Sequence, residues 1–290
     1  MREVLAASRP FSWVNTAYPF AAGYLMSTGG RIDVALVVGT LYFLGPYNLL
    51  MYGVNDVFDY ESDLRNPRKG GIEGALADPA RARTVHRRIL WACAATNVPV
   101  LVWLLALGDA TAGLVLALVV FGVVAYSAPR LRFKERPVLD SLTSAMHFVG
   151  PLLYALVLTG TDLSARTAWP VVVAFVAWGM ASHAFGAVQD VRADRAGGLA
   201  SVATVLGARR TVVAATGAYV VAAVVLLAVP WPGVLAAVLP LPYAGNAARF
   251  WSVRDDDCER AHAGWRVFLW LNLVTGFCVT MLLIAEARLG

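Results

Sequence analysis

The sequence predicts an all-α fold, a polytopic bundle of transmembrane helices. The chain has 290 residues, of which 59% are hydrophobic and 15% charged, and its mean hydropathy is +0.63. Soluble domains carry about 25% charged residues, so this chain lacks the polar residues that a water-facing surface requires. Its apolar residues also gather in long runs, and its basic residues lie between those runs. These observations predict a surface that faces lipid.

A helix that spans a membrane needs about 20 mostly apolar residues. Nine segments of the chain meet this requirement, and they predict nine transmembrane helices in one domain covering residues 1–290. The second segment contains Gly45 and Pro46, which predict a kink because proline lacks the N–H that an uninterrupted helix uses. The nine predicted segments are 11–28, 34–54, 88–107, 111–128, 139–160, 168–188, 211–229, 233–250 and 266–285.

The basic residues are distributed unevenly between the two predicted sides of the membrane. Of the 24 Lys and Arg residues, 21 lie in the N-terminus and the loops on its side, and only Arg31, Arg166 and Arg288 lie opposite. Because cytoplasmic loops collect Lys and Arg, we expect an integral membrane protein with a cytoplasmic N-terminus and an external C-terminus. The net charge of +5 is therefore explained by membrane topology and does not indicate nucleic-acid binding.

A first acidic motif lies at the predicted cytoplasmic end of the second segment. It contains Asn55, Asp56, Asp59 and Asp63. If the helix continues through the motif, the three aspartates share one face, because residues three and four apart are neighbours on a helix. Three like charges on one face repel each other unless a cation lies between them, and magnesium prefers hard oxygen ligands. The alternative, a solvated acidic helix end, is disfavoured by the helix dipole.

A second acidic motif ends the sixth segment on the same predicted side. Asp190 and Asp194 are one helical turn apart, and His183 precedes them on the same predicted helix. Two such motifs could each hold one magnesium ion, and the two ions could bridge one diphosphate. His183 is either a polar residue satisfied within the bundle or a residue that contacts substrate. Intramembrane carboxylates also occur in transporters, but here the aspartates cluster at one rim rather than near the midplane.

Basic residues near both motifs could bind the diphosphate, because Lys and Arg are the usual partners of phosphate. The same residues could equally serve only to orient the protein in the membrane. The candidates for diphosphate binding are the basic residues Arg68, Lys69, Lys134 and Arg192, together with Tyr126, which begins the loop that contains Lys134.

The two aspartate motifs and the loop from Tyr126 to Lys134 resemble those of the UbiA-type intramembrane prenyltransferases, over essentially the whole chain. The second motif has Ala193 where the commonest form of the family has glycine. The resemblance implies a magnesium-dependent enzyme that ionises an isoprenyl diphosphate and transfers the prenyl group to an apolar or aromatic acceptor. It assigns the metal and diphosphate ligands to Asn55, Asp56, Asp59, Asp63, Asp190 and Asp194, and a phosphate contact to Lys134.

Two stretches, from Asn55 to Gly71 and from Arg9 to Trp13, look like those of bacterial lycopene elongases. This resemblance implies a bacterial membrane enzyme that transfers C5 units from dimethylallyl diphosphate to lycopene in C50 carotenoid synthesis, with or without hydration. Arg9, Trp13 and His183 are candidates for the acceptor pocket. An aromatic-acceptor prenyltransferase of quinone synthesis and a small-molecule or ion transporter remain the alternatives. The residues identify no base for the final proton transfer, and they leave the oligomeric state open.

Overall fold

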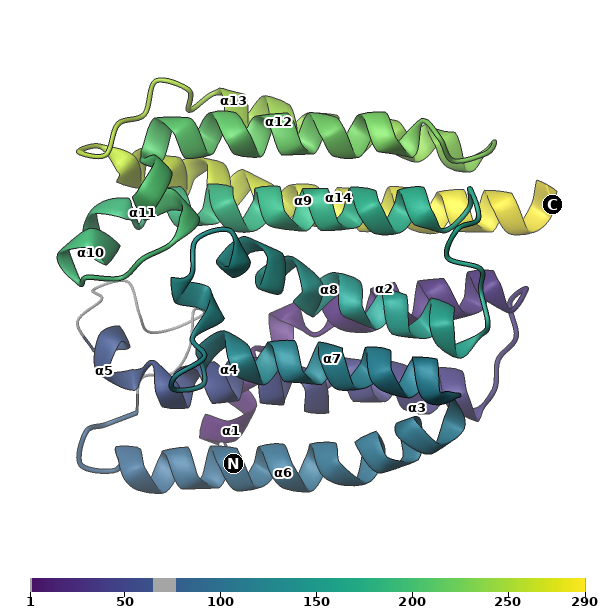
Figure 1. The fold of residues 1–290 in the computed structure, drawn as a ribbon, viewed down its shortest axis with the longest axis horizontal. Helices are drawn as coiled ribbons and strands as arrows, with labels where there is room; N and C mark the ends of the chain where they lie inside the picture. The colour runs from purple at the N-terminus through teal and green to yellow at the C-terminus, as the bar shows by residue number, and fades with distance from the viewer. Residues whose placement is uncertain (1, 65–76, 290) are drawn as a thin grey trace. The chain divides into compact units, whose positions relative to one another are not determined.

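The computed structural model describes residues 2–64 and 77–289, and the part of the chain that it describes contains helices and no strands (Figure 1). The predicted all-α membrane fold is confirmed. Seven described helices are long and apolar enough to cross a membrane. These seven run from Val34 to Phe58, Ala82 to Leu107, Ala110 to Ser127, Leu139 to Leu158, Trp169 to Val188, Ala208 to Leu226 and Cys258 to Glu286.

The predicted count of nine spans is not confirmed, because two predicted segments contain shorter helices. In segment 11–28 the α-helix covers only 14 residues, from Val14 to Ser27, after a 3₁₀ turn at Pro10–Ser12. In segment 233–250 a 3₁₀ helix is followed by an α-helix that begins at Leu241, directly after Pro240. Proline favours the first helical turn and cannot continue a preceding helix, so it divides this apolar run.

The described residues form two compact units. The first comprises residues 1–133 and 150–161, and the second comprises residues 134–149 and 162–290. Helix α8 (Leu139–Leu158) contributes residues to both units. The other helices of the first unit are α1 (Arg2–Ala7), η1 (Pro10–Ser12), α2 (Val14–Ser27), α3 (Val34–Leu44), α4 (Pro46–Phe58), α5 (Tyr60–Asp63), α6 (Ala82–Leu107), α7 (Ala110–Ser127) and the start of η3 (Phe133–Glu135).

Within the first unit, α2 packs on α3, and α4 packs between α6 and α7. Asp33 and Asp109 are the N-cap residues of α3 and α7, and their carboxylates accept from the backbone N–H groups of Leu36 and Ala112. Such N-cap bonds satisfy donors that a helix leaves open. At the predicted kink the helix is interrupted: α3 ends at Leu44 and α4 begins at Pro46.

The core of the first unit is aromatic. Phe20 and Phe43 have ring centroids 5.1 Å apart, and Tyr47 and Tyr154 pack against Phe43. Gly39 allows this packing, because a Cβ at that position would lie 2.2 Å from the Phe20 ring. Buried aromatic pairs contribute beyond the area they bury. This core fixes α2, α3 and α8 on one another and so holds α4, which carries the first motif.

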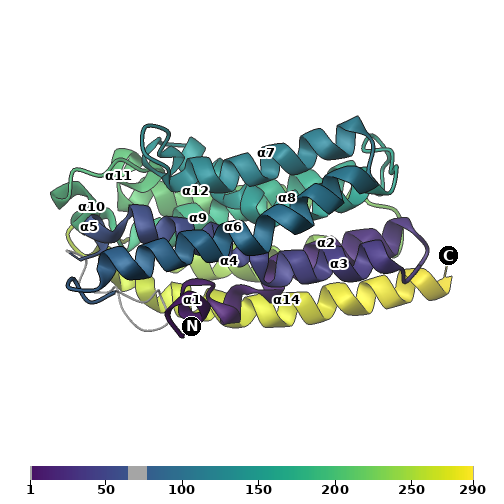
Figure 2. The same ribbon diagram turned by 90° about the horizontal axis from the view of Figure 1, so that it is seen from below.

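Within the second unit, α9 packs along α12 (Figures 1 and 2). Helix α14 packs against both α9 and α13. The core is again aromatic and includes Trp178, Tyr219, Tyr243 and Phe268. This packing fixes α9, whose end carries the second motif. The helices of this unit are α9 (Trp169–Val188), α10 (Val191–Ala196), α11 (Val202–Leu206), α12 (Ala208–Leu226), η4 (Gly233–Val238), α13 (Leu241–Ala248), η5 (Cys258–Ala261) and α14 (His262–Leu289).

Candidate prenyl-transfer site

The first acidic motif spans the end of α4 and a helix break. Helix α4 ends at Phe58, Asp59 is its C-cap, and Tyr60 begins the short helix α5. The N–H of Asp59 donates to the carbonyl of Asn55 at 2.9 Å, so Asp56 and Asp59 still share a helical turn. The helix does not continue unbroken through Asp63, because α4 ends at Phe58 and α5 begins at Tyr60. That the three aspartates share one face stays a prediction.

Arg9 binds the first carboxylate of the motif. Its Nη2 donates to Oδ1 of Asp56 at 3.0 Å, and its guanidinium lies 4.5 Å from the centre of the Tyr52 ring. Arg9 adopts a left-handed backbone conformation with φ of 49°, which costs energy for a residue that is not glycine. Arg9 was predicted to line the acceptor pocket, and the structure places it on the first acidic motif.

Arg132 lies beside the second carboxylate of the motif and was not among the predicted site residues. Its Nη2 is 3.6 Å from Oδ1 of Asp59, whose side chain is only 3% exposed. Arg132 also has positive φ, as does Arg130 two residues earlier. A buried carboxylate requires such a compensating charge. The basic composition of this loop signals the role, but only the fold selects Arg132 from its neighbours.

Asn55 binds the end of α7. The hydroxyl of Ser127 donates to the side-chain oxygen of Asn55 at 2.6 Å. Tyr126, the predicted phosphate contact beside Ser127, is half-buried at the end of the same helix, and Lys134 is half-buried in η3. The hydrogen bond joins the first motif to the end of α7, which carries Tyr126. Such a contact is needed if Asn55 and Tyr126 belong to one site.

The remaining predicted site residues of this part of the chain add no contact to the first motif among the described residues. Arg68 and Lys69 lie outside the described residues, and the side chain of Asp63 is not described. The indole N–H of Trp13 donates to the carbonyl of Ser8 at 2.9 Å, which ties it to the turn after α1. Whether Trp13 also contacts an acceptor stays a prediction.

The second motif has the predicted spacing. Asp190 follows the end of α9 and precedes α10, and the N–H of Asp194 donates to the carbonyl of Asp190 at 2.8 Å. The two carboxylates therefore belong to one helical turn. Arg192, between them, is exposed and pairs with Glu259 at 2.7 Å, so in this structure it extends toward the segment before α14.

Arg195 fixes the segment that follows the second motif. It donates to the carbonyl of Thr204 and pairs with Asp255. Asp255 also accepts from the N–H of Ala208 at 2.6 Å, and this bond, followed by the Arg195 pairing, lowers the pKa of the Asp255 carboxyl. These contacts hold α10, α11 and the start of α12 together, and so position Asp194.

His183 contacts a buried carboxylate of the second unit. Its Nε2 is 3.7 Å from Oδ2 of Asp140, whose side chain is fully buried, while His183 is 18% exposed. The N–H of Val202 donates to the same Oδ2 at 2.7 Å. The sequence reasoning missed Asp140, because nothing in its local pattern distinguishes it from a residue that begins a helix.

The donor set of the two motifs fits magnesium. Asp56 and Asp59 supply hard carboxylate oxygens one turn apart, as do Asp190 and Asp194. Among residues 2–64 and 77–289, no group of three or more His, Cys, Asp or Glu side chains is arranged to hold a metal. Magnesium is commonly bound by one or two carboxylates together with substrate phosphates. Pairs of carboxylates are therefore a suitable set for an ion that arrives with a diphosphate.

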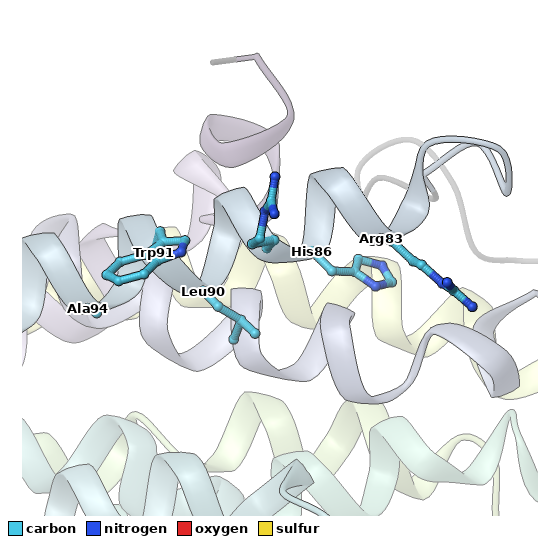
Figure 3. A pocket seen from close by; sticks show the side chains of 6 residues that line it. Arg83, His86, Leu90, Trp91 and Ala94 are labelled. Atoms are coloured by element: carbon cyan, nitrogen blue, oxygen red, sulfur yellow. The ribbon is translucent and has the colours of Figure 1, made fainter.

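A cavity of about 550 Å³ lies elsewhere, along the outer face of α6 (Figure 3). Its lining comes entirely from that helix and includes none of the predicted site residues; it consists of Arg83, His86, Arg87, Leu90, Trp91 and Ala94. Basic residues followed by an exposed tryptophan are typical of a helix at the membrane–water interface. Its lining contains no residue of either aspartate motif.

The helical membrane fold and the paired aspartate motifs define the class of protein, an intramembrane prenyltransferase. The model of the UbiA prenyltransferase family matches residues 16–273, and the chain belongs to this family. The predicted enzyme class is thereby confirmed, and the transporter alternative loses its support.

Among known proteins, the chain is similar to several with names in carotenoid synthesis. It is 50% identical to a lycopene elongase/hydratase of Corynebacterium glutamicum, over 98% of this chain and 97% of that protein. It is 54% identical to the C(50) beta-cyclic carotenoids biosynthesis protein LbtBC of a Dietzia species, over 96% of this chain and 63% of that longer protein. A lycopene elongase/hydratase of Haloferax volcanii is 34% identical, over 94% of this chain and 86% of that protein.

Solved structures share the fold. A UbiA homolog from Archaeoglobus fulgidus bound to DMAPP and Mg²⁺ superposes with a TM-score of 0.70 at 18% identity, covering 94% of this chain and 98% of that one. The apo structure of a UbiA homolog from Aeropyrum pernix gives a TM-score of 0.64 at 18% identity, covering 94% of this chain and 98% of that one. At this identity the superpositions establish the fold alone.

Proposed function

We propose that this prenyltransferase transfers the dimethylallyl group of dimethylallyl diphosphate to lycopene, as a lycopene elongase or elongase/hydratase of C50 carotenoid synthesis. The observation that carries the proposal is the identity of 50% over nearly the full length of both chains with a protein of that name. The donor is supported by the name of the homologous structure that contains DMAPP and Mg²⁺. The acceptor is apolar, which agrees with an enzyme whose helices lie in lipid.

In this proposal the carboxylates of both motifs hold magnesium and, through it, the diphosphate. The ligands would be Asn55, Asp56, Asp59, Asp63, Asp190 and Asp194, and two ions would bind together with the diphosphate. Bound magnesium supplies positive charge that stabilises the departing diphosphate. The arginine pairs support this role, because each places a positive charge beside a carboxylate of the first motif.

Basic side chains of the protein compensate the negative charge of the leaving diphosphate that the metal does not. Arg68, Lys69, Lys134 and Arg192 are proposed to bind phosphate oxygens, with Tyr126 as a hydroxyl donor. Arg9 and Arg132 lie beside Asp56 and Asp59 and hold these carboxylates in position before substrate binds. Their guanidinium groups could also bind phosphate oxygens. In this way the electrostatic stabilisation is organised before the bond breaks, as effective catalysis requires.

The proposed orientation places the N-terminus and both motifs on the cytoplasmic side and the C-terminus outside. This follows from the excess of Lys and Arg in the loops that carry the motifs. It agrees with the chemistry, because a charged diphosphate reaches the motifs from water while lycopene enters from lipid. Cysteine-accessibility labelling of single-cysteine variants at each terminus tests this orientation directly.

The test of the function uses the purified protein in liposomes that contain lycopene, supplied with Mg²⁺ and radiolabelled dimethylallyl diphosphate. We expect carotenoids enlarged by one or two C5 units, with loss of product when EDTA removes the metal. A matched reaction replaces lycopene with 4-hydroxybenzoate, a water-soluble aromatic acceptor. Labelled 4-hydroxybenzoate product with unchanged lycopene would refute the elongase proposal and establish the aromatic-acceptor alternative.

A further inference from the structure

Asp140 is a fully buried carboxylate at the start of α8 that belongs to neither aspartate motif. Its Oδ1 accepts from the N–H of Ser141 and its Oδ2 from the N–H of Val202, each at 2.7 Å. These backbone bonds hold the carboxylate in place. Its Oδ1 also accepts from the hydroxyl of Ser141 at 3.3 Å, and Nε2 of His183 on α9 lies 3.7 Å from its Oδ2. The carboxylate is therefore positioned to orient the imidazole ring.

The position of His183 on α9 relates it to the second motif. His183 precedes Asp190 by seven residues, so the two lie on the same face, about 10 Å apart along the helix axis. The turn continues past the end of α9, because the N–H of Asp190 donates to the carbonyl of Ala187 at 3.1 Å. His183 therefore lies deeper in the membrane than Asp190, on the same side of the helix, and it is partly accessible.

Prenyl transfer ends with a step that is separate from the metal and diphosphate binding assigned to the aspartate motifs. The carbon that leaves the diphosphate forms the new bond to the acceptor, and a cation then develops on the adjacent acceptor carbon. That cation must lose a proton or gain a hydroxyl, within a few bonds of the diphosphate site. A base slightly deeper than the metal ligands is suitably placed, and histidine is the side chain that most often serves as one.

We propose, on the basis of the proposed function, that His183 is the base of this final step and that Asp140 is its positioning residue. In the elimination, a C–H bond next to the cation breaks, its electron pair forms the new C=C bond, and the proton goes to the imidazole. In the hydration, a water oxygen bonds to the cation and the proton of that water goes to the same imidazole. The imidazolium then releases its proton to water, which restores the enzyme.

A carboxylate beside a catalytic histidine holds the ring in a productive orientation and stabilises the positive charge that the ring acquires. Asp140 meets both requirements, since its backbone bonds do not depend on His183. A purely structural role is the competing explanation, in which Asp140 ties α11 to α8 through Val202 and His183 only fills space. The two explanations differ in what happens to the cation on the acceptor once the new C–C bond has formed.

The experiment measures diphosphate release and carotenoid product in the same liposome reaction, with dimethylallyl diphosphate, Mg²⁺ and lycopene. The variants are His183→Gln, His183→Ala and Asp140→Asn. The matched control is Ser182→Ala, which removes a buried hydroxyl on the same helix that bonds to Trp178 and Tyr219. Circular dichroism and thermal unfolding of each purified variant verify the fold, and the Gln and Asn variants preserve side-chain volume.

We expect both His183 variants to release diphosphate within about threefold of the parent rate, while carotenoid formed per diphosphate falls at least tenfold. Without the base, the acceptor cation reverts by breaking the new C–C bond, and water captures the dimethylallyl cation that is released, so dimethylallyl alcohol should account for the difference. Asp140→Asn should show the same uncoupling to a smaller extent, and added imidazole should partly restore coupling to His183→Ala. Ser182→Ala should couple as the parent does.

Parent-like coupling in a folded His183→Gln, or equal losses of diphosphate release and product in every variant, would overturn the assignment. A parent enzyme that releases diphosphate but never enlarges lycopene would refute the proposed function instead. The two failures are therefore distinguishable in one set of measurements.

Discussion

Asp59→Asn tests the assignment of the first motif most directly. The substitution keeps the shape of the side chain, removes its negative charge and takes one oxygen ligand from the proposed metal site. Because the Asp59 side chain is only 3% exposed, water cannot easily replace the lost ligand. We expect kcat to fall by about 10²- to 10³-fold, the loss typical when a preorganised electrostatic contact is removed from an active site.

The effect on folding should be much smaller. Arg132, the partner of Asp59, retains 29% side-chain exposure and therefore keeps part of its hydration when the carboxylate is gone. The lost pairing should cost about 1 kcal/mol, against a typical folding free energy of about 5–15 kcal/mol. The folded population therefore changes little, and a loss of 100-fold or more in turnover cannot come from unfolding.

The matched variant is Arg132→Gln, which breaks the same pair but keeps the carboxylate. The assay measures initial rates as a function of Mg²⁺ at saturating dimethylallyl diphosphate. Asp59→Asn should raise the Mg²⁺ concentration needed for half-maximal rate, whereas Arg132→Gln should change it little. Asp162→Asn, in an exposed loop where the carboxylate accepts from the N–H and the hydroxyl of Ser164, is the control for removing an aspartate. Equal Mg²⁺ requirements for Asp59→Asn and the parent would refute the metal-ligand assignment.

Three further predictions concern the second motif, acid sensitivity and core packing. Asp190→Asn should reduce turnover by about 10²-fold or more, with an unchanged thermal transition, and near-normal rates would remove this residue from the site. The bond from the Ala208 N–H lowers the pKa of the Asp255 carboxyl, so the stabilisation from this carboxylate is present at neutral pH and is lost as pH falls below about 4. The difference in Tm between the parent and Asp255→Asn should therefore close in acid. A difference that stays constant with pH would contradict this. Gly39→Ala would place a Cβ 2.2 Å from Phe20 and should destabilise the protein by about 1–3 kcal/mol, measured as a lower Tm, and an unchanged Tm would show that the ring can move.

The acidic motifs illustrate what can be predicted from local sequence. The spacing of Asp190 and Asp194 correctly predicted two carboxylates in one helical turn, because the backbone geometry between residues four apart is local. The same reasoning placed Asp63 on that face only if the helix continued, and α4 ends before Asp59. A helix break at an acidic cap depends on the packing of the following segment, which the local pattern does not contain.

The sequence by itself determined the all-α membrane fold, the break at Gly45 and Pro46, and the membership of one prenyltransferase family. These follow from hydropathy, backbone sterics and motif spacing, which act over a few residues. Only the tertiary structure decided which basic groups meet which carboxylates: Arg9 reaches Asp56 across 47 positions of the chain, and Arg132 approaches Asp59. The sequence shows many arginines beside many aspartates, and helix packing selects the pairs, because a charge can be buried only where its partner is held within a few ångströms.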